Sequence, residues 1–368
     1  MSTINVRKPT SSRGFSAAIL CAGSLLMCAS ASAGSVIGHC VSTAQQLQNA
    51  LSSASNGGQY NGMDNRIKIV QGLYQTRLVT NPGPGTFFYE NDANTGVLSV
   101  EGGYNADCSA RSSNPLATLI DGNSLYPVMD LRSKKGQVKV SGVTIENGES
   151  ISQGGGLSIN VANTDDSAVL VFDTIIRNNH TTRFGGGLYV GSDGTGNMAV
   201  VHNTLIVGNS ADQGDSAVEV VSNGDGVGFY DNTVSGNSVP AAGAARSVYL
   251  ASTDGTCDVA NNIIQSNPNG GLWMSCTGAA TLYFNDIGNI LNDSGALRAG
   301  NVSIDPMFVD ASGGNYRLAA SSPLIGMSHW LTGGADLLGA SYPTSGHQDV
   351  GAYEDTIFVD SFDEQVLF

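Results

Sequence analysis

The chain has 368 residues, of which 48 are glycine and only 13% are charged, and its formal net charge is −15. A surface of that sign repels nucleic acid and anionic lipid, so the charge argues against both as partners. The many Gly, Asn, Ser, Thr and Val residues favour short strands joined by tight turns over helices. We therefore expect an all-β protein.

The first residues predict an export signal. Arg7, Lys8 and Arg13 precede a short apolar run that ends in Ala31-Ser32-Ala33. A basic start, an apolar stretch too short to cross a bilayer and small residues before the cleavage point describe a signal peptide over residues 1–33. Its removal changes the net charge from −15 to −18, because three basic residues and no acidic residue are lost. No later apolar run is long enough to span a membrane, so we expect a soluble protein that is secreted or held at the cell surface.

The region after the signal predicts a short helix and then a strand. Apolar residues have helical spacing over 42–51, Ser42 is placed to cap that helix, and residues 67–70 have the pattern of a strand. A helix here would cover the open end of a stack of coils, since a solenoid must hide its terminal apolar layer.

Six similar segments then follow one another at intervals of 32, 30, 28, 30 and 24 residues, beginning at Ser141, Asp173, Asn203, Asp231, Asn261 and Asn285. Each segment is a short apolar strand that opens with Asn, Asp or Ser and closes on Asn. A repeat of this length predicts a solenoid. Asn tolerates the left-handed backbone of a sharp corner, and its amide can bond to the equivalent residue one coil away. The asparagines are therefore predicted to form structural ladders.

A second strand in each repeat alternates with period two, which assigns its side chains to two faces. The inward positions, predicted to stack as the core, are Leu157, Ile159, Leu188, Val190, Val218, Val220, Val248, Leu250, Leu272 and Met274. The outward positions between them are Ser158, Tyr189, Glu219, Tyr249 and Trp273. The fold class predicted for residues 34–354 is thus one right-handed parallel β-helix domain.

The carboxy-terminal part of the chain breaks the repeat pattern. Residues 305–354 are rich in Gly, Ser and Pro, which predicts an irregular cap at the other end of the solenoid. Residues 355–368 alternate acidic and apolar side chains, which predicts a disordered tail or a sorting tag.

Four cysteines follow the signal peptide, namely Cys40, Cys108, Cys257 and Cys276. An even number in an exported chain predicts two disulfides. Three pairings remain open, and the sequence positions favour Cys40 with Cys108 and Cys257 with Cys276. A zinc site is the competing interpretation, but the chain has no CxxC pair and its five histidines are scattered.

At this point the chain resembles known exported proteins. Its repeats resemble the right-handed parallel β-helix superfamily that includes the pectate-lyase-like enzymes. Its end resembles that of choice-of-anchor Q domain proteins in the motifs Asp305-Pro-Met-Phe, Ser322-Pro-Leu-Ile and Asp349-Val-Gly-Ala-Tyr-Glu, although Gly326-Met-Ser replaces the usual Asp-x-Gly. The resemblance implies export and a surface or extracellular role, and it supplies no catalytic residue.

The outward file of Tyr189, Glu219, Tyr249 and Trp273 is the predicted substrate-binding site. Aromatic faces stack on the C–H faces of sugars, and the spacing of coils, about 4.8 Å, is close to the length of one sugar unit. A carboxylate between aromatic rings can orient hydroxyl groups. The alternative is that these rings only cover the surface of a sheet.

A polysaccharide lyase acting on an acidic glycan is the second hypothesis. It needs a base and a cation or Arg to neutralise the substrate carboxylate. The catalytic candidates are Arg177, His180 and Arg183 on one loop, and the candidates for a calcium site are Asp165, Asp166, Asp212 and Asp215. Solvated loop charges are the simpler interpretation of both sets.

The sequence therefore predicts a monomeric glycan-binding or adhesive module whose partner is a polysaccharide or cell-surface glycan. No cofactor is expected unless the lyase hypothesis holds, in which case calcium is. A paired-carboxylate hydrolase is disfavoured because no Asp pair falls on a repeat strand.

Overall fold

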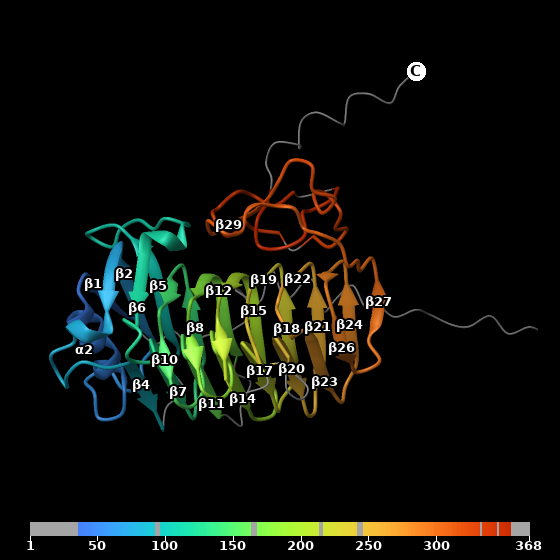
Figure 1. The fold of residues 1–368 in the computed structure, drawn as a ribbon. Coiled ribbons are helices and arrows are strands. Elements are labelled where there is room, and N and C mark those ends of the chain that lie inside the picture. Colours follow the sequence, from blue (N-terminus) through green and yellow to red (C-terminus); the bar gives the residue numbers. More distant parts are fainter. Residues whose placement is uncertain are drawn as a thin grey trace, which may run out of the picture.

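The computed structural model describes residues 36–92, 96–162, 168–212, 216–240, 246–331, 333–343 and 346–354. The predicted signal peptide and the predicted tail lie outside the described residues. The described part is all-β apart from one α-helix and two short 3-10 helices, and nearly all its strands are parallel (Figure 1). Stacked parallel sheets of this kind are consistent with the predicted parallel β-helix.

The largest sheet has 16 strands and covers two faces of the stack. Its main path is β1 (Ile37–Val41), β2 (Asn65–Val70), β5 (Leu98–Tyr104), β8 (Val138–Ser141), β12 (Ala168–Arg177), β15 (Met198–Val207), β18 (Gly226–Tyr230), β21 (Thr256–Ala260), β24 (Ala280–Tyr283) and β27 (Leu297–Ala299). The strands beside this path are β3 (Gly72–Gln75), β6 (Thr118–Asp121), β9 (Thr144–Glu146), β19 (Thr233–Ser235), β22 (Ile263–Gln265) and β25 (Asp286–Ile287). The long strands β12 and β15 pass through both groups and so join the two faces.

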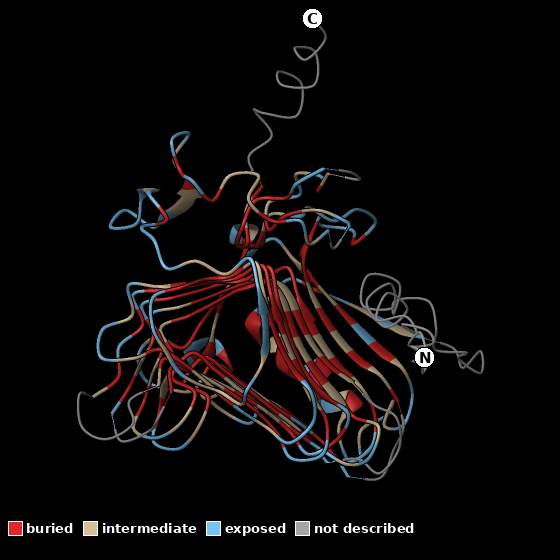
Figure 2. Cartoon of the chain, turned by 90° about the vertical axis from the view of Figure 1, so that its right-hand side faces the viewer, coloured by how far each residue is buried: buried red, intermediate tan, exposed pale blue. Residues whose placement is uncertain are grey.

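The second sheet has eight strands and forms another face. In spatial order they are β4 (Phe87–Asn91), β7 (Met129–Ser133), β11 (Leu157–Ala162), β14 (Leu188–Asp193), β17 (Val218–Ser222), β20 (Val248–Ser252), β23 (Leu272–Cys276) and β26 (Ile290–Asp293). A three-stranded sheet contains β10 (Glu149–Ser150), β13 (His180–Thr181) and β16 (Ser210–Ala211). The stack is seen from its end in Figure 2, where the coils have a roughly triangular outline.

The core lies inside this outline and has the predicted composition. All ten inward positions named above are completely buried, and they belong to one continuous apolar cluster that runs along the stack. Each Leu, Ile or Val removed from water in this way contributes about 1.5 to 3 kcal/mol. The period-two pattern was therefore sufficient to assign the faces of these strands.

The asparagine ladder is present, with one correction. Asn179, Asn209 and Asn237 are buried, and the backbone N–H of each donates to the side-chain oxygen of the next, the last acceptor being Asn267, at 3.0 Å in each case. Asn147 does not belong to this ladder. Glu146 pairs with Arg177, so the residue opposite Asn179 is Gly148, whose backbone N–H donates to the Asn179 side chain. The first interval between repeats is therefore 31 residues, not 32.

A second ladder was not recognised in the sequence. Asn232, Asn262, Asn285 and Asn301 follow one another in the same way, with backbone N–H to side-chain oxygen distances of 2.9 to 3.0 Å. Each asparagine of this ladder comes one residue after the left-handed corner residue of its repeat. The dipeptides Asp231-Asn232 and Asn261-Asn262 were its sequence signal, because a polar pair at a corner offers one residue for the turn and one for the ladder.

Helix α2 (Ala44–Ala54) lies against the first coils, as Figure 1 shows. Its N-cap is Thr43, whose hydroxyl accepts from the backbone of Gln46 at 3.2 Å, and not Ser42 as predicted. The helix buries Leu47 and Leu51 completely in the main core. The 3-10 helices η1 (Thr76–Leu78) and η2 (Pro115–Ala117) lie in connecting segments.

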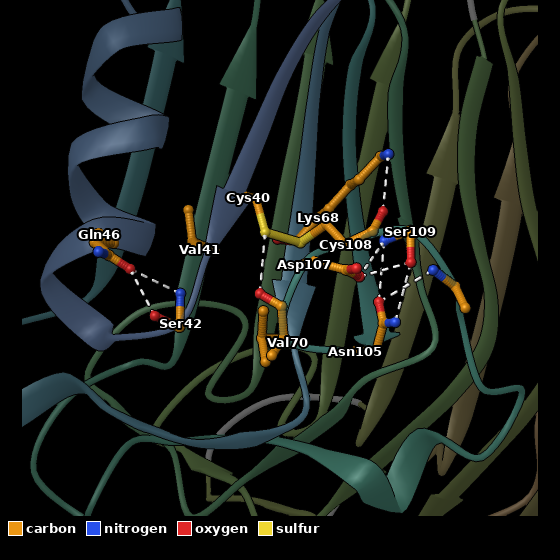
Figure 3. Close-up of a disulfide and its surroundings, with 12 residues drawn as sticks. Cys40, Val41, Ser42, Gln46, Lys68, Val70, Asn105, Asp107, Cys108 and Ser109 are labelled. Atoms are coloured by element: carbon orange, nitrogen blue, oxygen red, sulfur yellow. Dashed lines mark hydrogen bonds between the residues drawn. A yellow bond between two sulfur atoms is a disulfide. The ribbon is translucent and has the colours of Figure 1, made fainter.

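The two disulfides join the pairs that the sequence favoured. Cys40 of β1 is bonded to Cys108 in the loop after β5, and Cys257 of β21 to Cys276 of β23, with Cα–Cα distances of 5.9 and 6.0 Å. Figure 3 shows the first bond, beside which the Lys68 ammonium donates to the Cys108 carbonyl at 3.3 Å. Two disulfides fit an oxidising compartment. No helix of the described residues is long and apolar enough to cross a membrane.

Residues 305–354 form a separate segment along one corner of the coils (Figures 1 and 2). The segment contains the antiparallel pair β28 (Phe308–Asp310) and β29 (Asn315–Leu318) and is otherwise irregular. Its Leu337 and Ala352 pack with Ile175 and Leu205, which belong to strands in the middle of the stack. The sequence predicted an irregular cap over the end of the solenoid, whereas the described contacts lie along its side.

Candidate functional site

The four residues of the predicted outward file stand in register on successive strands of the eight-stranded sheet. Tyr189 of β14 pairs with Glu219 of β17, which pairs with Tyr249 of β20, which pairs with Trp273 of β23. All four are half-buried. Parallel strands lie about 4.8 Å apart, so the file presents one side chain per coil in a straight line along the stack.

Two further residues complete the file, and the sequence analysis missed both. The guanidinium carbon of Arg246 lies 4.6 Å from the ring centroids of both Tyr249 and Trp273. The hydroxyl of Ser216 donates to the carboxylate of Glu219 at 2.9 Å. Both stand three residues before a file residue, and this shared offset was the available signal. The file therefore combines aromatic rings, a carboxylate held by Ser216 and a cation held by two rings.

The same file continues toward the amino-terminal end of the sheet. Ser158 pairs with Asp130 of β7, and Asp130 pairs with Phe88 of β4. Arg132 forms an ion pair with Asp130 at 2.6 Å and lies 5.4 Å from the Phe88 ring centroid. An aromatic ring with an arginine thus lies near each end of the file. Sequence reasoning missed this part because Phe88 and Asp130 precede the recognisable repeats.

A hollow of about 550 Å³ opens next to Phe88. Its walls come from α2 and from the loop before β4, and they include Gln48, Ser52, Val79, Pro82, Pro84 and Glu90. A second hollow of about 400 Å³ lies at the corner formed by residues 264–270 and 288–289. Neither hollow is lined by Tyr189, Glu219, Tyr249 or Trp273.

Small side chains border the file on the strand positions two residues further along. Gly191, Val221, Ala251 and Ser275 pair in sequence on β14, β17, β20 and β23. A Cβ added to Gly191 would meet the Asn160 side-chain oxygen at 3.1 Å, which is tight, and the Tyr189 ring at 3.4 Å. The Tyr189 ring and Asn160 therefore already lie beside Gly191.

The predicted catalytic candidates are each bound to a different partner. Arg177 forms an ion pair with Glu146 at 2.6 Å, and the Arg183 guanidinium lies 5.2 Å from the Phe184 ring centroid. His180 lies between two carboxylates, with Nδ1 at 2.7 Å from Glu149 and Nε2 at 3.1 Å from Asp212. No contact among the three candidates is found in the described residues.

The surroundings of His180 make it a poor general base. Burial by itself lowers the pKa of a histidine, but the hydrogen bonds to Asp212 and Glu149 outweigh burial, so the pKa of His180 is raised. When it is protonated, the ring can donate to both carboxylates. Both ring nitrogens are already engaged with carboxylates, so neither is free to take a proton from a substrate in this arrangement.

Of the four predicted calcium ligands, the structure describes only Asp212. Asp165, Asp166 and Asp215 lie outside the described residues, and Asp212 is bonded to His180 as stated above. Within the described residues, no group of three or more His, Cys, Asp or Glu side chains is placed to hold a metal ion.

The acidic residues of the motif at 349–354 accept hydrogen bonds from the backbone of their own segment. The carboxylate of Asp349 accepts from the backbone of Gly326 at 2.6 Å, and that of Glu354 accepts from the backbone of Asp349 at 3.1 Å. Asp336 accepts from the backbones of Leu338, Ala340 and Glu354 at 2.7 to 3.0 Å. These three buried carboxylates fold the carboxy-terminal segment on itself.

A buried polar column attaches that segment to the coils. We call Asp173, Asn203, Asp231 and Asn261, which all have φ between 50° and 59°, the corner column. Gln348 donates to Asp231 at 2.8 Å, Tyr342 donates to Asn203 at 3.2 Å, and Asn261 donates to the backbone of Asp349 at 2.9 Å. The left-handed corners expected for turns therefore also bind the end of the chain.

His202 adjoins the corner column. It stands in register between Phe172 and Tyr230 of the neighbouring strands. It also makes an ion pair, since its Nε2 lies 3.0 Å from the carboxylate of Asp231, which is fully buried. Burial would lower the pKa of His202, but the hydrogen bond and charge of Asp231 outweigh this effect and raise it.

The fold and these contacts define a class, namely an all-β protein built of stacked parallel sheets with an aromatic and acidic file on one face. In comparisons with known proteins, no family model, no curated protein and no solved structure matches this chain.

Proposed function

We propose that this protein binds an extended glycan along the outward file. The observation that carries the proposal is that Tyr189, Glu219, Tyr249 and Trp273 stand in one line, one per coil, on one face of the sheet. The coil spacing of about 4.8 Å is close to the length of one sugar unit, so successive units meet successive side chains.

The chemistry of the file suits carbohydrate. Aromatic rings bury the apolar C–H faces of sugars, while hydroxyl groups need partners that accept and donate hydrogen bonds. Glu219 supplies the acceptor and Arg246 the donor, and both are held in position by neighbouring groups, Ser216 for the carboxylate and two rings for the guanidinium. Preorganised polar groups reduce the entropy lost on binding.

The proposed setting is outside the cell. A signal peptide over residues 1–33, a right-handed parallel β-helix of the pectate-lyase-like superfamily and a choice-of-anchor Q type ending together describe an exported monomer at the cell surface or in the medium. The two disulfides support this setting. The function in that place is adhesion to, or recognition of, a polysaccharide.

The test is a glycan array probed with the purified protein and with Tyr249→Ala and Trp273→Ala. Each substitution removes one stacking surface, and we expect about tenfold weaker retention on the recognised glycan, equivalent to about 1.4 kcal/mol. Tyr126→Ala is the matched control, because Tyr126 is a half-buried aromatic residue that lies outside the file. Unchanged retention of both file variants would remove the file as the binding site.

A second assay separates binding from catalysis. The protein is incubated with alginate, pectate and glycosaminoglycans, with and without calcium, while the absorbance of unsaturated chain ends is followed. A binding module leaves the absorbance unchanged. Formation of unsaturated ends would overturn the proposal in favour of a polysaccharide lyase.

A further inference from the structure

Two histidines of the carboxy-terminal segment face each other across a short antiparallel bridge. Ser328 and Gln348 exchange two backbone hydrogen bonds, each of 2.9 Å. His329 and His347 are the next opposed pair. In antiparallel strands, a pair next to a hydrogen-bonded pair has its side chains on one face with short Cβ separations. Accordingly the two ring centroids are only 4.0 Å apart, with an angle of 63° between the rings.

These two rings differ from the other histidines of the chain. His39 is hydrogen-bonded to Asn65 at 3.0 Å, and His180 and His202 are bound to carboxylates. His329 and His347 instead touch each other, and His329 also lies 5.6 Å from the Phe284 ring. Both are exposed. Within the described residues, no carboxylate or amide bonds to either ring, so their nitrogen lone pairs face solvent.

We propose that His329 and His347 form a binding site for a divalent transition-metal ion. Imidazole nitrogen is a preferred ligand of Zn²⁺, Cu²⁺ and Ni²⁺, with metal–nitrogen distances of about 2.0 to 2.1 Å for zinc. Two nitrogens on one tetrahedral ion are then about 3.3 Å apart, a separation that two exposed rings at this distance reach by rotating about their side-chain bonds.

The donor set decides which ions bind. Two imidazoles leave the remaining coordination positions to water, so affinity follows the general order of first-row ions, with Cu²⁺ above Ni²⁺ and Zn²⁺. Ca²⁺ and Mg²⁺ prefer oxygen ligands and do not bind here. The net charge of −15 raises the local concentration of cations and so favours capture.

Metal binding at this pair would fasten the carboxy-terminal segment. His347 is followed by Gln348, which donates to Asp231, and by Asp349, whose carbonyl accepts from Asn261. An ion shared with His329 links this stretch to the one at 328–330, where Trp330 stacks with Tyr230 at a centroid distance of 6.4 Å. Because the pair exists only in the folded chain, bound metal stabilises the fold.

The experiment uses the purified full chain without an affinity tag. Titration with Zn²⁺ is followed by calorimetry and by the thermal unfolding midpoint, for the unchanged chain and for His329→Gln and His347→Gln. We expect one ion per chain, a rise in the midpoint with Zn²⁺, and at least tenfold weaker binding in each variant, because the second ligand acts at a high effective concentration. Addition of Ca²⁺ should not change the unfolding midpoint of the unchanged chain or of either variant.

His180→Gln is the matched control, since it removes a histidine that is engaged with carboxylates, and it should retain the ion. Electron paramagnetic resonance of the Cu²⁺ complex gives a second readout, with two nitrogen ligands in the unchanged chain and one in each variant. The inference fails if the double variant binds Zn²⁺ as tightly as the unchanged chain, or if no saturable binding occurs. Either failure leaves the glycan proposal untouched, because the two sites share no residue.

Discussion

The two ends of the coil stack are closed in different ways. At the amino-terminal end, helix α2 covers the outer edge of β4, and its side chains replace a neighbouring strand. The Gln48 amide donates to the carbonyl of Phe88 at 3.2 Å and accepts from its N–H at 3.1 Å, and Ser55 accepts from Glu90 at 3.2 Å. A strand edge satisfied in this way is not available to another chain.

At the carboxy-terminal end, the last coil is closed by charge. Asp293 of β26 pairs with Met274, and Arg298 of β27 pairs with Leu282, so both take positions that face the interior in the preceding coil. Arg298 Nε donates to Asp293 at 2.6 Å across the coil. Inward-pointing charges at a sheet edge prevent edge-to-edge association. Fully buried apolar side chains therefore carry stability at one end, and an ion pair limits association at the other.

The largest difference between the ends should appear on truncating an apolar side chain. Leu51→Ala removes a completely buried side chain of α2 and should lower the free energy of unfolding by about 3 kcal/mol. Leu297→Ala at the last coil, where the side chain is 61% exposed, should change it by less than about 0.5 kcal/mol. Denaturant unfolding measures both. Equal losses would mean that the last coil is as tightly packed as the first.

A smaller effect on the free energy of unfolding should come from pH. It acts through residues 305–354, which lie along the corner of the coils and do not cover the last coil. Burial, with the nearby charge of Asp349, raises the pKa of Glu354 to about 8. Between about pH 4.5 and pH 8 the folded chain therefore holds a proton that the unfolded chain has lost. The contribution of this group to the free energy of unfolding is fully present below about pH 4.5 and is lost as the pH rises to about 8.

Glu354→Gln tests this linkage. Gln keeps an oxygen that can accept from the backbone of Asp349 and does not titrate, so the variant should gain about 2 kcal/mol relative to the unchanged chain between pH 6 and pH 8. Asp254→Asn, which removes one exposed carboxylate, is the control for net charge. Unfolding free energies across this pH range give the answer, and parallel pH profiles for Glu354→Gln and the unchanged chain would contradict it.

Only a small effect on stability, below about 1 kcal/mol, is expected from replacing Asp293 and Arg298 together by Leu, because the side chains are 21% and 48% exposed. The self-association of this variant should nevertheless rise, since an apolar strand edge becomes available to a second copy. Light scattering at increasing concentration measures the association. Replacing the exposed pair Asp92 and Lys134 by Leu is the control, and equal association of the two variants would show that the end of the stack is not special.

Much of this architecture could be predicted because it repeats. Alternation of apolar residues identified the inward positions, and four cysteines after a predicted signal peptide pointed to two disulfides. The register that aligns Tyr189, Glu219, Tyr249 and Trp273 also followed from the spacing of repeats. The proposed partner of this file does not follow from alternation, since the same pattern serves a surface that binds nothing.

The sequence alone determined the period of the coils, the composition of the core and the line of outward aromatic residues, because local alternation and turn chemistry are written along the chain. The tertiary structure decided where residues 305–354 lie, which polar corners hold them and how the last coil ends. Those outcomes depend on contacts between residues far apart in sequence, such as Gln348 with Asp231, and no periodic pattern encodes which pairs meet. The same reason explains why the opposed pair of His329 and His347 became visible only in the folded chain.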